Sequence, residues 1–308
     1  MTPIVNEGSY PLGAADEAPH PAAADLLWNE SYYLDFVTAD GRAGGYVRLG
    51  LYPNWDRAWY WACLVRDGQP AITIVDHDVP LPGDSLAVAG ADFQAGYAVT
   101  RPLETARATL ESARLGLDLQ WQTAGGVYGY SLVPRYEVPC TVTGTVRVDG
   151  EEIAVSGFGE RDHSWGVRDW WSVSWLWSSG RLEDGSYLHA MRPNLGFELP
   201  WPSFVVPPGG VLAAAGGLTV ATDFTAAGQP ERSRLQLPGA DLTVTPRDLV
   251  SITMTSPGGV DAHFARALCT FRAADGRSGY GWTEWHQPSG WRDHGWKAAP
   301  AGEGAAAG

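Results

Sequence analysis

Residues 141–156 read Thr-Val-Thr-Gly-Thr-Val-Arg-Val-Asp-Gly-Glu-Glu-Ile-Ala-Val-Ser, and their pattern predicts a β-hairpin. Three valines alternate with other residues up to Asp149-Gly150, after which Ile153 and Val155 resume the alternation. Apolar residues at every second position line one face of a strand, and Asp-Gly is a favoured two-residue hairpin turn. The hairpin therefore delivers the chain to the segment that follows it, residues 157–166.

Similar alternation recurs elsewhere in the chain. Residues 113–121 alternate apolar and polar side chains, and residues 171–177 do so before Asp184-Gly185 turns the chain back through 187–191. Only residues 102–113 have a spacing compatible with an amphipathic helix. The sequence therefore predicts an all-β protein, in which antiparallel barrels or sandwiches would hide the strand edges.

The length of 308 residues exceeds the usual size of a single hydrophobic core and predicts two domains. We expect an N-terminal domain over residues 23–168 and a C-terminal domain over 169–297, because one hairpin closes and another opens near 168–171. The flanking segments are expected to be flexible at 1–22 and disordered at 298–308, where the composition is of low complexity.

Charge and hydropathy exclude several kinds of partner. The formal net charge is −14, and no cluster of Lys and Arg offers a surface for nucleic acid or anionic lipid. No run of eighteen apolar residues and no secretory leader pattern is present, so we expect a cytoplasmic protein without membrane insertion. The three cysteines lie far apart, which fits reduced thiols. The oligomeric state stays open.

The segment 157–166 reads Gly-Phe-Gly-Glu-Arg-Asp-His-Ser-Trp-Gly and concentrates an acid, a base, a cation and an indole. In a regular strand Arg161, His163 and Trp165 face one side and Asp162 faces the other, unless a β-bulge at the glycines re-aims one of them. Histidine titrates near neutral pH, and a carboxyl group can donate a proton or orient the imidazole. The alternative is a satisfied hydrogen-bond network at a domain junction.

A second aromatic segment lies near the end of the chain. Alternation places Tyr280, Trp282, Glu284 and His286 on one face of a strand, where a carboxylate and an imidazole among aromatic rings would suit acid–base chemistry. Ordinary interior layers of a barrel have the same composition. The 15 tryptophans occur in bunches, which predicts either large cores or a cavity that stabilises a cation.

Metal and cofactor motifs are not found in the sequence. The spacings of His77, His189 and His263 match no closed zinc site and no facial triad, so no metal is predicted. Nucleophile-elbow, Walker and dinucleotide fingerprints are also missing, and no cofactor is expected.

The 157–166 segment resembles the Gly-x-Gly-x-x-Asp-His-Asn-Trp-Gly signature of the carotenoid hydratase (hydroxyneurosporene synthase-like) superfamily. Asp162, His163 and Trp165 match it, whereas Ser164 stands where Asn is usual and Arg161 replaces an aromatic residue or histidine. With these two departures the motif is similar to that of a divergent bacterial branch, which carries Arg-Asp-His-Ser-Trp-Gly. The resemblance implies two tandem lipocalin-like domains, with an apolar pocket at or near their junction.

What the resemblance implies about function is a cofactor-independent hydratase, dehydratase or isomerase of a terpenoid-like hydrophobic alkene. Asp162 or His163, with Glu284, would supply the acid–base groups, and indole faces would stabilise a cation. The residues expected to bind the substrate are Arg161, Trp165, Trp175, Trp177, Tyr280, Trp282 and His286. The main alternative is a non-catalytic lipocalin-like carrier of a hydrophobic small molecule, and a weaker one is carbohydrate binding.

Overall fold

The computed structural model of the chain describes residues 2–8, 10–83, 85–131, 133–197 and 201–291. Nearly all regular structure in these ranges is β, with two short 3-10 helices, η1 (Ala14–Glu17) and η2 (Pro53–Trp55). The all-β prediction is therefore confirmed. Neither helix of the described ranges is long and apolar enough to cross a membrane.

The N-terminal half forms a 12-stranded sheet that curls back on itself. Its order is β5-β4-β3-β2-β12-β11-β9-β8-β7-β6, and short β10 joins β11 to β1. Because the first long strand, β2, pairs with the last, β12, strands β5 and β6 lie at opposite edges of the sheet although they are neighbours in the chain. The strands are β1 (Ile4–Asn6), β2 (Trp28–Thr38), β3 (Ala43–Tyr52), β4 (Arg57–Arg66), β5 (Gln69–Val79), β6 (Ala87–Ala89), β7 (Phe93–Arg101), β8 (Thr105–Ser112), β9 (Leu115–Thr123), β10 (Val127–Gly129), β11 (Arg135–Val148) and β12 (Glu151–Val167).

The C-terminal half forms a nine-stranded sheet built by the same rule. Its order is β16-β15-β14-β13-β21-β20-β19-β18-β17, so that the first strand, β13, again pairs with the last, β21. The strands are β13 (Trp175–Leu182), β14 (Tyr187–Pro193), β15 (Ser203–Val206), β16 (Ala213–Ala214), β17 (Thr219–Phe224), β18 (Pro230–Leu237), β19 (Ala240–Thr255), β20 (Asp261–Ala273) and β21 (Ser278–Pro288).

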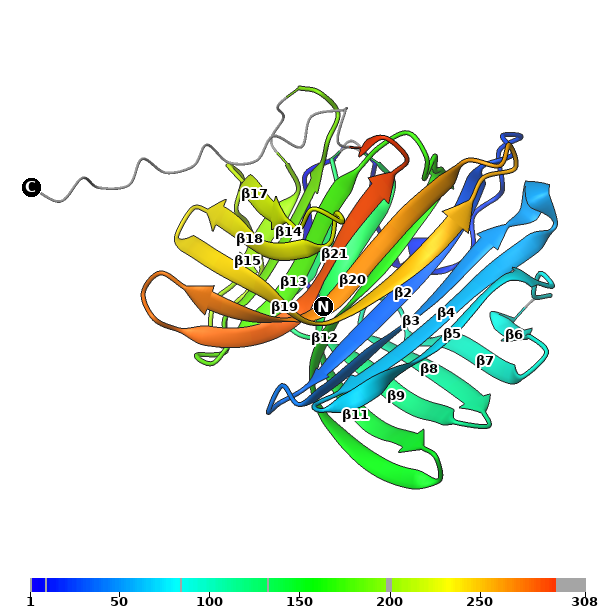
Figure 1. Cartoon of the computed structure of the whole chain (residues 1–308), viewed down its shortest axis with the longest axis horizontal. Helices are drawn as coiled ribbons and strands as arrows, with labels where there is room; N and C mark the ends of the chain where they lie inside the picture. The colour runs from blue at the N-terminus through cyan, green and yellow to red at the C-terminus, as the bar shows by residue number, and fades with distance from the viewer. Residues whose placement is uncertain (1, 9, 84, 132, 198–200, 292–308) are drawn as a thin grey trace, which may run out of the picture.

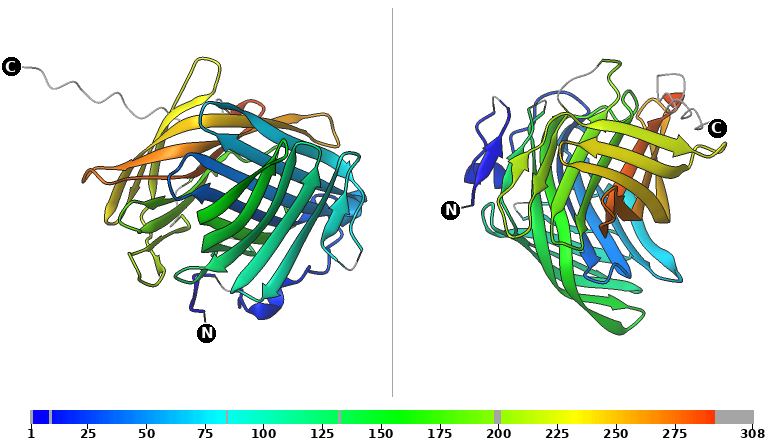
Figure 2. Two further views of the ribbon diagram at one scale, coloured as in Figure 1. Left: turned by 90° about the horizontal axis from the view of Figure 1, so that it is seen from below. Right: turned by 90° about the vertical axis from the view of Figure 1, so that its left-hand side faces the viewer.

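Three apolar clusters hold these sheets together. One lies within the N-terminal sheet around Trp121, and another lies within the C-terminal sheet around Trp285. The third contains Trp61, Trp177 and Trp282 and joins the two sheets. Figures 1 and 2 show the curled sheets side by side, with β2 and β12 next to the C-terminal sheet. Each buried indole removes about 150–250 Å² of surface from water, so this shared cluster stabilises the packing of the two sheets against each other.

Strands β12 and β21 occupy equivalent places, each being the last strand of its sheet and paired with the first. Both begin their buried stretch with Gly-x-Gly, at 157–159 and 279–281. A Cβ on Gly159 would lie 2.0 Å from the carbonyl oxygen of Asp35, and one on Gly281 would lie 2.0 Å from that of Ser179. The glycines are therefore required where the first strand of each sheet crosses the last closely.

The predicted hairpin at 141–156 is confirmed, because β11 and β12 are joined at Asp149-Gly150 with φ values of 48° and 93°. The helix that the spacing of residues 102–113 would allow does not form. Residues 105–112 form β8, whose Ala106, Ala108 and Leu110 enter the N-terminal cluster while the strand pairs with β7 and β9. Burial of these alternate residues in a sheet overrides a weak local pattern.

The chain passes from one sheet to the other between Val167 and Trp175, which is where we place the boundary of the two predicted domains. Residues 1–22 differ from the flexible segment expected, because β1 pairs with β10, Glu17 bonds to Arg161 and His20 bonds to Glu30. The expected disordered tail, 298–308, lies outside the described residues.

Candidate functional site

Strand β12 presents the 157–166 motif to two different sides of the N-terminal sheet. Its register with β11 and β2 runs through the motif without a bulge. As the alternation predicts, Asp162 points to the junction of the sheets, where it meets Arg135, whereas Arg161 and His163 point the opposite way. The two residues expected to share one site therefore belong to two separate clusters.

A pocket of about 480 Å³ lies at the junction, beside the end of β12. Tyr130, Arg135, Arg168 and Asp169 supply its polar groups, and the indoles of Trp165 and Trp175 form part of its wall. Apolar side chains dominate the rest, among them Val133, Val167, Val173, Met191, Leu195 and Phe197. This combination of an apolar surface with a few converging polar groups is typical of a small-molecule site.

Other hollows of the described chain fit a ligand less well. A pocket of about 610 Å³ next to β5 borders none of the buried acid–base groups. The space enclosed by the N-terminal sheet around Leu34 and Tyr60 measures only about 10 Å³, which is room for one water molecule at most. The interior of this sheet is filled with side chains, so the junction is the better candidate.

A chain of hydrogen bonds leads from the junction pocket into the protein. The Tyr130 hydroxyl lies 2.7 Å from Nε2 of His189, and Nδ1 of His189 lies 2.6 Å from Oε1 of Glu160. All three side chains are almost fully buried. Tyr130 follows β10, His189 belongs to β14 and Glu160 to β12, so both sheets contribute.

Burial sets the protonation of this chain. It lowers the pKa of His189 to about 4 and raises the pKa of Glu160 well above its ordinary value, so both groups are neutral at pH 7. Oε2 of Glu160 has no hydrogen-bond partner among the described residues, a placement that would be costly for an ionised carboxylate. When Glu160 donates to Nδ1, Nε2–H donates to the Tyr130 oxygen, and the phenol hydrogen is available to Glu137 or to a ligand in the pocket.

Arg135 lies between the pocket and two carboxyl groups. Its guanidinium donates to Glu137 at 2.6 Å and to Asp162 at 2.9 Å. Trp177 also donates to Glu137, at 3.2 Å. Burial raises the pKa of Glu137 despite Arg135. Asp162 thus reaches the pocket only through Arg135, which it orients, and does not line it.

The residues predicted on β21 do share the junction side of their strand. Glu284 forms an ion pair with Arg266 and accepts a hydrogen bond from Trp175 at 2.6 Å. His286 stacks on Trp175, with ring centroids 3.9 Å apart, and bonds to the carbonyl oxygen of Trp170. Burial lowers the pKa of His286 to about 3, so it is neutral. Both residues therefore support Trp175 from behind.

Besides His286 and Arg161, three more of the predicted binding residues do not line the pocket. Trp177 is buried against Glu137, and Trp282 donates to the carbonyl oxygen of Phe36 at 3.0 Å within the cluster between the sheets. Tyr280 packs beside Arg247, whose guanidinium lies 5.8 Å from its ring. Of the tryptophans named from the sequence, only Trp165 and Trp175 border the junction pocket.

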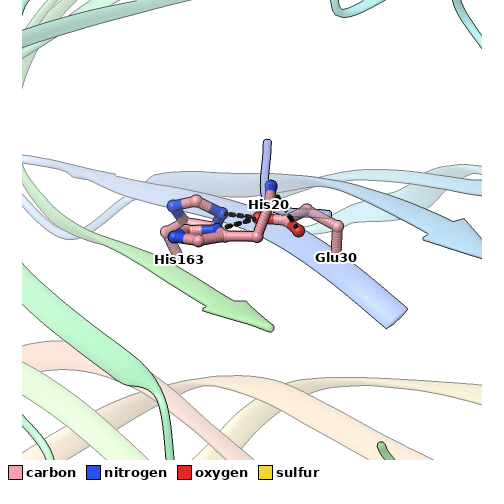
Figure 3. A group of neighbouring side chains, drawn as sticks. All are labelled: His20, Glu30 and His163. Atoms are coloured by element: carbon pink, nitrogen blue, oxygen red, sulfur yellow. Dashed lines mark hydrogen bonds and ion pairs between the residues drawn. The ribbon is translucent and has the colours of Figure 1, made fainter. Parts of the chain in front are cut away.

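His163 belongs to a second cluster on the opposite side of β12 (Figure 3). Its Nε2 lies 2.5 Å from Oε1 of Glu30, and Nδ1 of His20 lies 2.9 Å from the same oxygen. Although burial opposes it, Glu30 with Asp16 raises the pKa of His20. The His20 ring stacks on Trp165 at 3.8 Å, so this indole separates the cluster from the junction pocket.

Arg161 holds the N-terminal segment to the sheet instead of binding at the junction. Its guanidinium donates to both carboxylate oxygens of Glu17, at 3.1 and 2.7 Å. Tyr136 and the backbone N–H of Leu103 donate to the same carboxylate, at 2.7 and 2.6 Å. Although burial opposes it, Arg161 lowers the pKa of Glu17. The pair is buried, and the Glu17 carboxylate accepts four hydrogen bonds.

Two groups in the described part of the chain could hold a metal ion. His20, Glu30 and His163 form one, and Glu137, Glu160 and His189 form the other; the ligand atoms of each group lie within 4.8 Å of one another. Nitrogen and carboxylate ligands suit zinc and related ions. Neither group has a characteristic spacing in the sequence, because each joins residues from distant segments.

The sequence prediction missed Tyr130, Arg168 and the part that His189 takes in the hydrogen-bond chain. Strand pairing could have linked Glu137 to Asp162, which lie opposite each other on β11 and β12. No local pattern marks Tyr130, since its partner belongs to the other sheet. Contacts of this kind follow from the packing of the two sheets.

A family profile described as "Domain of unknown function (DUF7064)" matches residues 13–289. The chain belongs to this family. The DUF7064 region runs from η1 to the end of β21 and includes every strand of both sheets except β1. No curated protein matches the chain in sequence.

Solved structures share the fold of this DUF7064 protein. A protein assigned as AttH from Nitrosomonas europaea superposes with a TM-score of 0.66 at 16% identity, over 92% of this chain and 99% of that one. CghA superposes with 0.64 at 12% identity, over 85% and 89%. Kievitone hydratase from Nectria haematococca gives 0.64 at 12%, over 91% and 94%. At these identities the likeness establishes the two-sheet fold.

Proposed function

We propose that the chain is an enzyme of the hydro-lyase or isomerase type, which acts on a hydrophobic small molecule in the junction pocket. The observation that carries this proposal is the Glu160–His189–Tyr130 hydrogen-bond chain, which ends in the wall of an apolar pocket. Kievitone hydratase has the same fold, and the 157–166 motif resembles that of the carotenoid hydratases. Both support membership of a divergent branch of that superfamily.

In this proposal Tyr130 is the catalytic acid. It donates its hydroxyl proton to the substrate, takes a proton from Nε2 of His189, and Nδ1 takes one from Glu160. The carboxylate formed on Glu160 recovers its proton by the reverse transfers when the added water, or the carbon next to a leaving hydroxyl, releases one. Proton delivery and proton uptake balance over one turnover, so the same hydrogen-bond chain can serve hydration, dehydration and double-bond migration.

The remaining predicted residues take supporting parts. Trp165 and Trp175 would bind the apolar body of the substrate by stacking, and Glu284 and His286 would hold Trp175 in place. Asp162 would act as a positioning residue through Arg135. His163 and Arg161 would stabilise the N-terminal segment, because their partners are Glu30 and Glu17.

The carrier alternative is less well supported. A lipocalin-like carrier holds its ligand within the barrel, whereas the space inside the N-terminal sheet is about 10 Å³. A carrier also has no need of buried acid–base groups that connect to its pocket.

The experiment is turnover of hydrophobic enones and their hydroxylated counterparts in ¹⁸O-labelled water and in D₂O, with label incorporation measured by mass spectrometry. Tyr130→Phe keeps the ring and removes the hydroxyl, and should lower kcat by about 100-fold or more. Tyr128→Phe is the matched control. It removes a buried hydroxyl that bonds to Glu7 and does not border the pocket, so turnover should be unchanged.

Incorporation that persists in Tyr130→Phe would contradict the assignment of the catalytic acid. Ligands that bind in the pocket without any turnover across the panel would favour the carrier.

A further inference from the structure

Arg168 presents an unpaired cation to the junction pocket. It lines the pocket and is half-buried. Its guanidinium donates to Ser164 Oγ at 2.7 Å and lies 5.4 Å from the ring centre of Trp170, and it has no ion pair with a carboxylate of the described residues. The backbone N–H of Arg168 bonds to Leu27 at 3.0 Å, which fixes the residue at the pocket edge.

The surroundings of Arg168 are positively charged. Arg135 borders the same pocket, and buried Arg48 lies 5.0 Å from the Trp170 ring, with both terminal nitrogens lacking a hydrogen-bond partner in the described chain. Asp162 and Glu137 are the buried acids that contact this group, both through Arg135. Three guanidinium groups thus face two carboxyl groups, which leaves a surplus of positive charge in a protein whose net charge is −14.

The carboxylate that does border the pocket is that of Asp169. It is exposed to solvent, and it accepts hydrogen bonds from the backbone N–H of Trp171 at 2.9 Å and from the hydroxyl of Ser172. Burial, with Arg135 and Arg48, lowers the pKa of Arg168 to about 10, so the group stays charged at neutral pH. A half-buried cation without a carboxylate partner is costly, and a ligand anion would relieve that cost.

We infer that the substrate of this pocket is an amphipathic acid or carbonyl compound, whose apolar body lies against Trp165 and Trp175 and whose oxyanion is bound by Arg168. That the ligand is a substrate rests on the proposed function. That the ligand carries an oxyanion is argued from Arg168 alone. Guanidinium groups bind carboxylate, enolate and phenolate oxygens strongly where water is excluded.

This charge also decides between two reaction types. A carbocation formed in the pocket would be repelled by Arg168 and Arg135, whereas an enolate oxygen would be stabilised by them. The sequence-based expectation of an indole-stabilised cation therefore gives way to addition or elimination of water next to a carbonyl group. In that step Arg168 binds the oxygen on which charge develops, and Tyr130 exchanges the proton.

Two fluorescent probes of matched shape test the inference, anthracene-9-carboxylate and 9-anthracenemethanol. Because Trp165 and Trp175 border the pocket, binding can be followed by quenching of tryptophan emission in the full-length protein. The wild type should bind the carboxylate at least about 10-fold more tightly than the alcohol. Arg168→Met should remove this preference, and Arg168→Lys should keep most of it.

The matched control is Arg57→Met. Arg57 also lies over an indole, 5.0 Å from the Trp55 ring, and does not border the pocket, so the preference should persist. Equal affinity of the wild type for both probes, no binding of the carboxylate, or a preference that survives Arg168→Met in a variant with native circular dichroism would overturn the inference.

The outcomes also separate this inference from the proposed function. Selective carboxylate binding without turnover of any acidic or carbonyl alkene would leave the anion site standing and remove the enzyme proposal. Turnover that depends on Tyr130 but not on Arg168 would support the enzyme proposal and overturn the anion site.

Discussion

Asp35 lies fully buried between the sheets, where its carboxyl group accepts hydrogen bonds from the Tyr33 hydroxyl at 3.0 Å and the Glu160 N–H at 2.9 Å. Burial raises its pKa from 3.8 to about 7. The folded protein therefore binds this proton more tightly than the unfolded chain does. Stability from this group is complete below pH 3.8, falls as the pH rises through 7, and changes no further above that.

Asp35→Asn should flatten this dependence, because the amide does not ionise: its oxygen can accept from the Glu160 N–H and its NH₂ can donate to the Tyr33 hydroxyl oxygen. At pH 8 the variant should be more stable than the wild type by about 1–4 kcal/mol, and the difference should shrink towards pH 4. Urea unfolding at several pH values measures it.

Asp118→Asn serves as the control, since exposed Asp118 pairs with Arg107, which lowers its pKa and gives no reason for a gain at pH 8. A stability difference between Asp35→Asn and the wild type that is the same at pH 4 and pH 8 would count against the account of Asp35.

At the scale of elements, the N-terminal segment is held to β12 by one buried ion pair. Glu17 and Arg161 are 6% and 1% exposed, and the carboxylate has four donors. Glu17→Gln would leave the Arg161 cation uncompensated. We expect a loss of about 3–5 kcal/mol in the free energy of unfolding, measured by chemical denaturation.

Glu104→Gln is the matched control, because Glu104 forms a solvent-accessible pair with Arg101 at 3.3 Å. Its loss should stay below about 1 kcal/mol. Equal losses in the two variants would show that the Glu17 pair does not anchor the segment.

Sequence periodicity correctly predicted which side chains share a face of β12 and of β21, because side chains alternate strictly along a strand. Asp162 and His163 lie on opposite sides, and Glu284 and His286 share one, as expected. The partners were not predictable in this way. His163 pairs with Glu30 and Arg161 with Glu17, segments more than 130 residues away, and such contacts depend on the curl of the whole sheet.

Element type was harder to predict where local and tertiary preferences differ. The segment 102–113 carries a weak helical pattern, yet it pairs on both edges as β8. Residues 171–173 alternate like a strand, but β13 begins only at Trp175, after the chain has crossed between the sheets. In both cases the neighbours across the sheet, not the local spacing, decide the structure.

At the scale of the whole molecule, two sheets of the same topology meet through an aromatic cluster. The arrangement brings β10, β12 and β14 together, so that Tyr130, Glu160 and His189 can form one hydrogen-bond chain. Neither sheet alone contains this chain or the complete pocket wall. The proposed activity is therefore a property of the junction.

A crystal structure of the protein with anthracene-9-carboxylate tests this central claim most directly. We predict that the probe occupies the junction pocket, with its rings against Trp165 and Trp175 and its carboxylate bonded to Arg168. A probe bound inside the N-terminal sheet, or at His20, Glu30 and His163 with the junction pocket empty, would contradict the account.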